Sequence, residues 1–159
     1  MTVKLQVGDS APEFTLPATG GTVSLAQTLS EADRGVIIYF FPRAMTPGCT
    51  KQACDFRDSL DALVGEGYRV IGISPDSLER QDRFADKESV NFPLASDEDK
   101  SVMRAYGAYG MKMNYGKEVE GVIRSTFVVN KKGILDYVGY NVKATGHVAR
   151  LRRELGIDA

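Results

Sequence analysis

Two stretches of apolar residues stand out along the chain. Residues 36–41 are Val-Ile-Ile-Tyr-Phe-Phe, and residues 69–74 hold Val70, Ile71 and Ile73 within a similar stretch. Continuous runs of β-branched and aromatic residues are typical of strands that are buried on both faces of a parallel sheet. The pattern therefore predicts a central strand at 36–41 and a second strand at 69–74.

Hairpin and helical patterns surround these two strands. Residues 13–16 and 22–25 flank the turn-forming Thr19-Gly20-Gly21, which predicts a β-hairpin near the N-terminus, and residues 121–130 and 133–140 predict a second hairpin. Helical patterns are expected at 26–32, 77–87, 99–106 and 144–155. Hairpins join antiparallel strands, whereas helical crossovers join parallel ones. The predicted fold class is therefore α/β with a mixed central sheet flanked by helices.

Composition limits the range of functions. The chain shows no internal repeat or flexible linker, so residues 1–159 are assigned to a single domain. Twenty Lys and Arg against 21 Asp and Glu give a formal net charge of -1, which leaves no basic surplus for binding nucleic acid. No signal peptide or apolar run of membrane-spanning length is present, so neither membrane insertion nor export is expected. A cytoplasmic location is the expectation.

The ligand-forming residues are few. Cys49, Cys54 and His147 are the only good soft or borderline metal ligands, too few for a four-ligand zinc site, and no metal or cofactor is expected. In a reducing compartment two cysteines do not form a disulfide scaffold, so they are either buried and inert or chemically active. His147 follows Gly146 at the start of an amphipathic helix, where a capping or surface role is favoured over general base catalysis.

The segment after the central strand favours an active cysteine. Thr46 followed by Pro47 predicts a helix start, with Thr as N-cap and Pro at the first position, which puts Cys49 at the third. Unpaired first-turn N–H groups and the helix dipole favour a thiolate there. The Thr46 hydroxyl can accept a bond from a first-turn N–H while donating to a thiolate or peroxide oxygen. Pro42 has no N–H and can form a dry wall, although each proline alone could simply end a strand or begin a helix.

Helical spacing places the two cysteines on different faces. Cys49 begins a stripe of residues that is expected to face the core, whereas Cys54 lies about 140° away beside Asp58 and Asp61. Cα atoms five residues apart in a helix are separated by roughly 8.5 Å, but a disulfide needs less than about 7 Å. If the cysteines react with each other, the helix has to unwind locally. Otherwise Cys54 is an inert helical cysteine.

The run that contains Pro42, Thr46 and Cys49 resembles the Pro-x-x-x-Thr-x-x-Cys signature of the peroxiredoxins. The longer stretch FFPRAMTPGCTKQAC is similar to the peroxiredoxin Q group, also called bacterioferritin comigratory protein, and the resemblance covers nearly the whole chain. It implies a thioredoxin-like fold with an N-terminal β-hairpin extension, and a monomer. It also implies hydrogen peroxide and organic hydroperoxides as substrates, with thioredoxin or a similar dithiol as reductant.

The resemblance also implies a role for each site residue. Cys49 matches the peroxidatic cysteine, Cys54 the resolving cysteine that forms a disulfide with it, and Thr46 the hydroxyl partner; Pro42 matches the shielding proline and Arg124 the site arginine. A fixed guanidinium can stabilise the negative charge that develops on the leaving oxygen. One departure is Gln52, which stands where the group often carries Glu and puts a carboxylate role there in doubt. Some members keep the resolving cysteine on the following helix, but residues 82–87 contain none.

Two other functions remain open at this point. A thioredoxin-like disulfide exchanger would also use a cysteine at a helix start, but it would normally carry Cys-x-x-Cys and a proline before the antiparallel strand of the sheet, where this chain has Arg124-Ser125-Thr126. A non-catalytic redox sensor would use oxidation of the cysteine to change a surface. The rate of peroxide turnover distinguishes a peroxidase from both.

Overall fold

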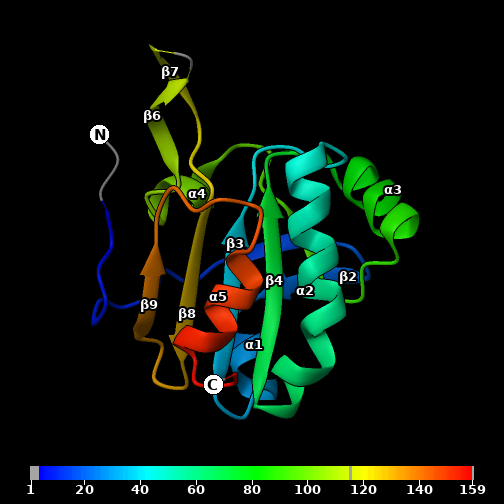
Figure 1. Ribbon diagram of the computed structural model, residues 1–159, viewed down its shortest axis with the longest axis vertical. Helices are drawn as coiled ribbons and strands as arrows, with labels where there is room; N and C mark the ends of the chain where they lie inside the picture. Colours follow the sequence, from blue (N-terminus) through cyan, green and yellow to red (C-terminus); the bar gives the residue numbers. More distant parts are fainter. Residues whose placement is uncertain (1–3, 115, 159) are drawn as a thin grey trace.

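A seven-stranded mixed sheet forms the centre of the computed structural model, which describes residues 4–114 and 116–158 (Figure 1). In spatial order its strands are β2 (Gly21–Ser24), β1 (Thr15–Ala18), β5 (Leu94–Ser96), β4 (Tyr68–Ser74), β3 (Gly35–Phe40), β8 (Ser125–Asn130) and β9 (Leu135–Gly139). The strands β3, β4 and β5 run parallel, and the remaining neighbours are antiparallel. The predicted α/β class with a mixed sheet is confirmed.

Helices cover both faces of this sheet. The five helices within the described residues are α1 (Leu25–Glu31), α2 (Pro47–Gly65), α3 (Leu78–Glu88), α4 (Ser101–Ala105) and α5 (His147–Glu154). Buried residues of α2, α3 and α5 share one apolar cluster, while those of α1 and α4 belong to a second cluster on the opposite face. The sheet is therefore the middle of three layers, with α2 and α5 side by side over one face (Figure 1).

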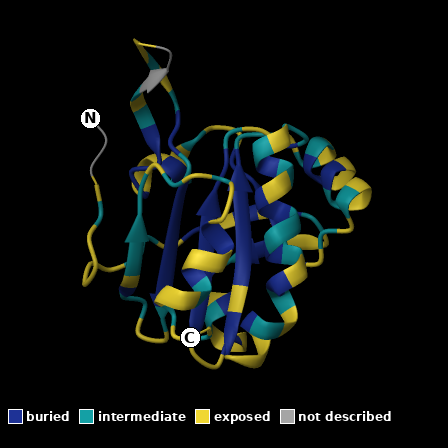
Figure 2. Ribbon diagram, in the orientation of Figure 1, coloured by how far each residue is buried: buried dark blue, intermediate teal, exposed yellow. Residues whose placement is uncertain are grey.

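The central strand β3 contributes to both apolar clusters. Val36, Ile38 and Phe40 face the α1 side, and Ile37 and Tyr39 face the α2 side, each with 0% exposure. Alternation of side chains along a strand sends successive residues to opposite faces. Burial of each such side chain stabilises the folded state by about 1.5–3 kcal/mol. Figure 2 shows β3 in dark blue, the colour of buried residues. The prediction of a strand buried on both faces is confirmed.

Several predicted elements have different bounds in the structure. The predicted strand over 121–130 is divided, because β7 (Lys117–Val122) ends before β8 begins at Ser125. Strand β7 pairs with β6 (Tyr109–Asn114) in a separate hairpin that extends from the body of the molecule (Figure 1). The last helix starts at His147 rather than at residue 144, because Gly146 adopts a left-handed conformation with φ 78 at the N-cap.

The N-terminal hairpin forms where it was expected, and it joins the main sheet. Strands β1 and β2 pair in antiparallel register from Thr15↔Ser24 to Ala18↔Gly21, and β1 then pairs with β5 through Ala18↔Ala95. The predicted extension therefore adds two strands to one edge of the central sheet. Among the described residues, no helix is both long and apolar enough to span a membrane.

Candidate active site

The start of α2 places Cys49 next to a helix N-terminus. Thr46 is the N-cap with φ -84 and ψ 155, and Pro47 is the first helical residue, as predicted. Cys49 is third in the helix and only 1% exposed, and no acidic residue lies in the first turn. The first-turn N–H groups and the helix dipole therefore act on the Cys49 sulfur without a neighbouring carboxylate on the same turn to oppose them.

The hydroxyl of Thr46 has a different partner from the one expected. It donates a 2.8 Å hydrogen bond to the carbonyl oxygen of Arg43 and does not accept a bond from a first-turn N–H. A hydroxyl has one proton, so this bond has to break before Thr46 can donate to a thiolate or a peroxide. The prediction that the Thr46 hydroxyl accepts a capping bond is wrong, whereas the prediction that Thr46 is the N-cap is confirmed.

A guanidinium from another part of the chain meets the cysteine. Arg124 lies just before β8, and its Nη2 is 3.2 Å from the Cys49 sulfur. Its Nη1 donates a 2.6 Å bond to Oε1 of Gln52, which is 0% exposed on α2 one turn after Cys49. An arginine can only donate, so the amide oxygen has to face it, and Nε2 of Gln52 has no hydrogen-bond partner among the described residues. The position of Arg124 is thus fixed by a neutral acceptor.

This neutral partner matters for the charge of the site. A carboxylate at position 52 would form a charged pair with Arg124 and offset its positive charge, whereas the Gln52 amide leaves that charge unopposed beside Cys49. Gly48 lies close to the same guanidinium, because a Cβ there would lie 3.4 Å from Arg124 Nη2. Arg124 therefore places a positive charge at hydrogen-bonding distance from the Cys49 sulfur.

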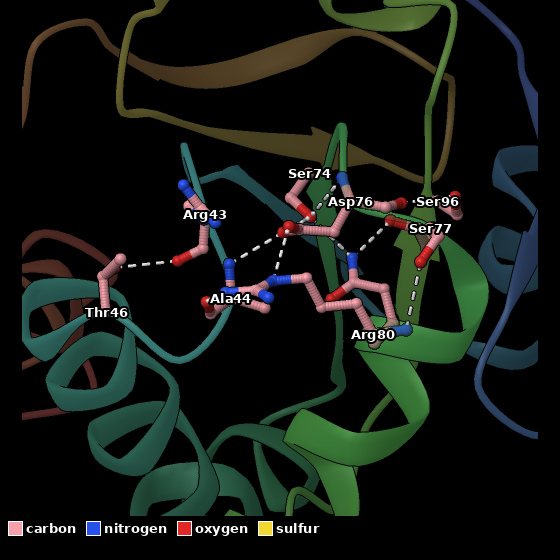
Figure 3. A network of polar contacts seen from close by, with 10 residues as sticks. Arg43, Ala44, Thr46, Ser74, Asp76, Ser77, Arg80 and Ser96 are labelled. Atoms are coloured by element: carbon pink, nitrogen blue, oxygen red, sulfur yellow. Dashed lines mark hydrogen bonds and ion pairs between the residues drawn. The ribbon is translucent and has the colours of Figure 1, made fainter.

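A polar network holds the loop between β3 and α2 (Figure 3). Asp76 accepts a 2.7 Å hydrogen bond from the Ala44 backbone N–H and a 2.6 Å bond from the Ser74 hydroxyl. Arg80 donates a 2.8 Å bond to the Ala44 carbonyl oxygen and pairs with Asp76 at 3.1 Å. Both backbone groups of Ala44 are thus bonded to side chains that lie at the start of α3. Sequence patterns gave no indication of this contact.

The residues that flank Ala44 show why the loop needs support. Met45 has φ 67, a left-handed conformation that is unfavourable for a residue with a Cβ. Pro42, half-buried two residues after β3 ends, lies on the same loop. The network around Asp76 therefore fixes the path of the chain from the sheet to Cys49.

Cys54 lies on the same helix but outside this constellation. Both cysteines are free thiols on the intact α2, and Cys54 is half-buried where Cys49 is fully buried. The Cys54 thiol faces α3, where it contacts the Glu88 carboxylate at 3.6 Å. Burial raises the pKa of Cys54, and Glu88 adds to the increase while Arg57 opposes it. The two sulfurs therefore point to different surroundings, as the helical spacing predicted.

His147 is buried, which contradicts the expected surface or capping role. It is 5% exposed, and its Nε2 lies 2.8 Å from the hydroxyl of Thr126 on β8. Burial, together with the positive charges of Arg150 and Arg124, lowers the pKa of His147 to about 4. The side chain is therefore a neutral imidazole at pH 7 that packs α5 against the sheet.

The arrangement can stabilise a sulfur anion and the oxygen anion of a leaving group within one small site. Cys49, Arg124 and Gln52 supply a nucleophile, a cation and the acceptor that orients the cation. Within the part of the chain that the structure describes, no three His, Cys, Asp or Glu side chains gather as a potential metal site.

Comparisons with known proteins agree with this arrangement. The model of the AhpC/TSA family matches residues 7–138. Peroxiredoxin Bcp of Escherichia coli K12 is 42% identical over 144 residues, covering 90% of each chain. A Mycobacterium tuberculosis H37Rv protein named as a candidate peroxiredoxin is 56% identical over 157 residues, 98% of each chain. The bacterioferritin comigratory protein of Xanthomonas campestris, whose structure was described for its alkyl peroxide reduction activity, superposes with a TM-score of 0.83 at 32% identity over 98% of each chain.

Proposed function

Because the chain belongs to the AhpC/TSA family, within the peroxiredoxin Q or bacterioferritin comigratory protein group, we propose that Cys49 is the peroxidatic cysteine of a thiol peroxidase. The family supports an antioxidant peroxidase activity. The observation that carries the assignment of the residue is the 3.2 Å contact between Arg124 Nη2 and the Cys49 sulfur at the start of α2. Cys54 lies beyond the first turn of α2, and its thiol hydrogen-bonds to the Glu88 carboxylate rather than to a guanidinium.

In the first step the Cys49 thiolate attacks the terminal oxygen of a hydroperoxide. A sulfur–oxygen bond forms, the oxygen–oxygen bond breaks, and the remaining oxygen leaves as an alkoxide or hydroxide that takes up a proton. Cys49 is then a sulfenic acid. Arg124 stabilises the charge on the leaving oxygen as it develops, and the first-turn N–H groups of α2 do the same. Hydrogen peroxide and organic hydroperoxides are the proposed substrates.

In the second step the Cys54 sulfur attacks the sulfenic sulfur of Cys49. A disulfide forms and the hydroxyl of the sulfenic acid leaves as water, with the proton coming from the Cys54 thiol. Cys54 faces Glu88 in the intact helix, so the first turns of α2 have to unwind for the two sulfurs to meet. Thioredoxin or a similar dithiol protein then reduces the disulfide by thiol–disulfide exchange.

Rapid mixing of the reduced protein with hydrogen peroxide tests this assignment. Cys49→Ser is expected to abolish the fast oxidation. Cys54→Ser removes only the second thiol, so the rate constant for oxidation of Cys49 should stay within about two-fold of the wild-type value, and the reaction should end at the sulfenic acid. Trapping with a sulfenic-acid reagent and mass spectrometry distinguish the two products. Oxidation of the wild type at the rate of a small free thiol would contradict the proposal, as would equal loss in both variants.

A further inference from the structure

The C-terminal end of α3 holds the part of α2 that carries Cys54. Arg57 Nη1 donates a 2.6 Å hydrogen bond to the backbone carbonyl of Glu88, and Asn91 Nδ2 donates a 3.4 Å bond to the carbonyl of Arg57. The Cys54 thiol, one turn before Arg57, reaches the carboxylate of the same Glu88 at 3.6 Å. Glu88 thus binds α2 through its backbone and its side chain at once.

The position of Glu88 is set by the end of its own helix. α3 stops at Glu88 because Ser89 adopts a left-handed conformation with φ 53, and the Val90 N–H closes the end on the Ala85 carbonyl at 3.0 Å. The backbone of Glu88 is therefore held at the end of α3, and its half-buried side chain stays attached there when the start of α2 unwinds. Movement of Cys54 toward Cys49 has to break the contact with Glu88.

The charged groups around Cys54 act on the pKa of its thiol in opposite directions. The charged or titratable groups that act on its thiol are Lys51, Arg57 and Asp58 on its own helix, Tyr39 on β3 and Glu88 on α3. Glu88 both repels a thiolate at Cys54 and accepts the hydrogen bond of the thiol, while Arg57 attracts the thiolate. The nucleophile that attacks a sulfenic acid is a thiolate. When Cys54 is held against Glu88, its sulfur therefore faces α3 instead of Cys49, and it is in the thiol form, which is less reactive than the thiolate.

We propose that Glu88 restrains the resolving step: by holding Cys54 as a hydrogen-bonded thiol against α3, it prolongs the lifetime of the sulfenic acid on Cys49. The inference rests on the proposed function and adds to it a positioning residue for Cys54. When α2 unwinds, the Cys54 thiol leaves the carboxylate and passes its proton to solvent, and its thiolate attacks Cys49; the hydroxide that leaves the sulfenic acid takes a proton back from solvent and becomes water. Glu88 has no part in the first step, because its contacts are with Cys54 and Arg57.

Glu88→Gln tests the restraint, because the amide keeps the shape of the side chain but removes its charge. The reduced variant is mixed with one equivalent of hydrogen peroxide, quenched with an alkylating reagent, and analysed by mass spectrometry for sulfenic acid and disulfide. Disulfide formation should be about two- to five-fold faster than in the wild type at pH 7, the range for losing one partly exposed charged contact. Its pH profile should shift toward lower pH, and the first oxidation should be unchanged.

Two further variants complete the experiment. Glu88→Ala, which removes both the charge and the acceptor, should accelerate disulfide formation at least as much as Glu88→Gln. Glu79→Gln is the matched control, because Glu79 lies in the first turn of α3 and pairs with Arg83 at the surface. Unchanged or slower disulfide formation in Glu88→Gln, with a normal wild-type disulfide, would overturn the restraint alone. A wild type that oxidises Cys49 without ever forming the disulfide would overturn the proposed second step together with the restraint.

Discussion

At the scale of single residues, Arg124 makes the contacts on which the proposed chemistry depends most. One nitrogen of its guanidinium faces the Cys49 sulfur and the other is fixed by Gln52. Replacement by Met keeps much of the side-chain volume but removes the charge and both donors. The rate constant for oxidation of Cys49 by hydrogen peroxide should fall about 100-fold, as for the loss of one oxyanion donor.

Rapid mixing measures this effect on the reduced protein. Arg153→Met is a suitable control because Arg153 is exposed on α5 and should leave the rate unchanged. A loss of less than three-fold in Arg124→Met would show that the helix start alone activates the cysteine, and that the guanidinium contact is incidental.

Residues whose environment is local were predictable from sequence, and those that depend on distant strands were not. Thr46 and Pro47 define the helix start by themselves, so the position of Cys49 follows from the four consecutive residues 46–49. His147 was misassigned because its burial depends on Thr126 of β8, which lies 21 positions earlier. Only the family resemblance suggested that Arg124 would lie near Cys49, since 75 positions separate them.

At the scale of elements, the loop between β3 and α2 is held by the start of α3. Asp76 accepts bonds from Ala44 and Ser74 and pairs with Arg80. Asp76→Asn removes the charge and should weaken this hold, by about 1–3 kcal/mol in unfolding free energy because buried partners lose an acceptor. The oxidation rate of Cys49 should fall by about ten-fold, since a small displacement of a reacting atom is costly.

Urea unfolding and rapid mixing with peroxide measure the two effects separately. Asp58→Asn, at an exposed position on α2, should change neither quantity. A loss of stability in Asp76→Asn with an unaltered oxidation rate would mean that the network supports the fold without positioning Cys49.

The elements that were predicted correctly are those with long, distinct patterns. Strands β3 and β4 have continuous apolar runs, and α3 has a Ser77 N-cap whose hydroxyl accepts from the Arg80 N–H. Strand β5 has three residues, too few for any period to be recognised, and it forms because β4 and β1 are already in place beside it. The β6–β7 hairpin was missed because β7, with Glu118 and Glu120 among its residues, lacks an apolar run.

At the scale of the whole molecule, the buried His147 links stability to pH. Its pKa of about 4 in the folded state lies below the value of 6.5 expected when unfolded. The unfolded chain therefore binds a proton in this interval that the folded chain does not, so folding stability is complete above pH 6.5 and is lost as pH falls toward 4. From pH 7.5 to pH 5 this group should reduce the unfolding free energy by about 2 kcal/mol.

Urea unfolding of the wild type and of His147→Gln at both pH values tests this linkage. The amide does not titrate, so the variant should lose about 2 kcal/mol less than the wild type over the same interval. Thr126→Val is the matched control, because it removes the 2.8 Å contact of the imidazole but leaves His147 buried and titratable. Equal pH dependence in the wild type and His147→Gln would rule out this residue as the source.

The general architecture was predictable because burial on both faces of β3 requires helices on both sides of a mixed sheet. The way in which the N-terminal hairpin joins that sheet was not, because a single registered pair, Ala18↔Ala95, makes the connection to β5. Such a contact depends on the assembled edge of the sheet and leaves no pattern in either segment.

The start and the end of α3 bind the two ends of the segment 44–57, and these contacts affect the equilibrium between the dithiol and disulfide forms of the protein. Ala44 is bonded to Asp76 and Arg80, and Arg57 is bonded to Glu88, so in the proposed cycle the chain between them is the part that loses its helical structure when Cys49 and Cys54 form a disulfide. Helical bonds broken in the oxidised protein reform on reduction and make reduction more favourable. For a two-electron couple, each 1.4 kcal/mol of this difference raises the reduction potential by about 30 mV. In the proposed cycle, the stability of α2 thus makes the disulfide form a stronger oxidant toward a dithiol reductant.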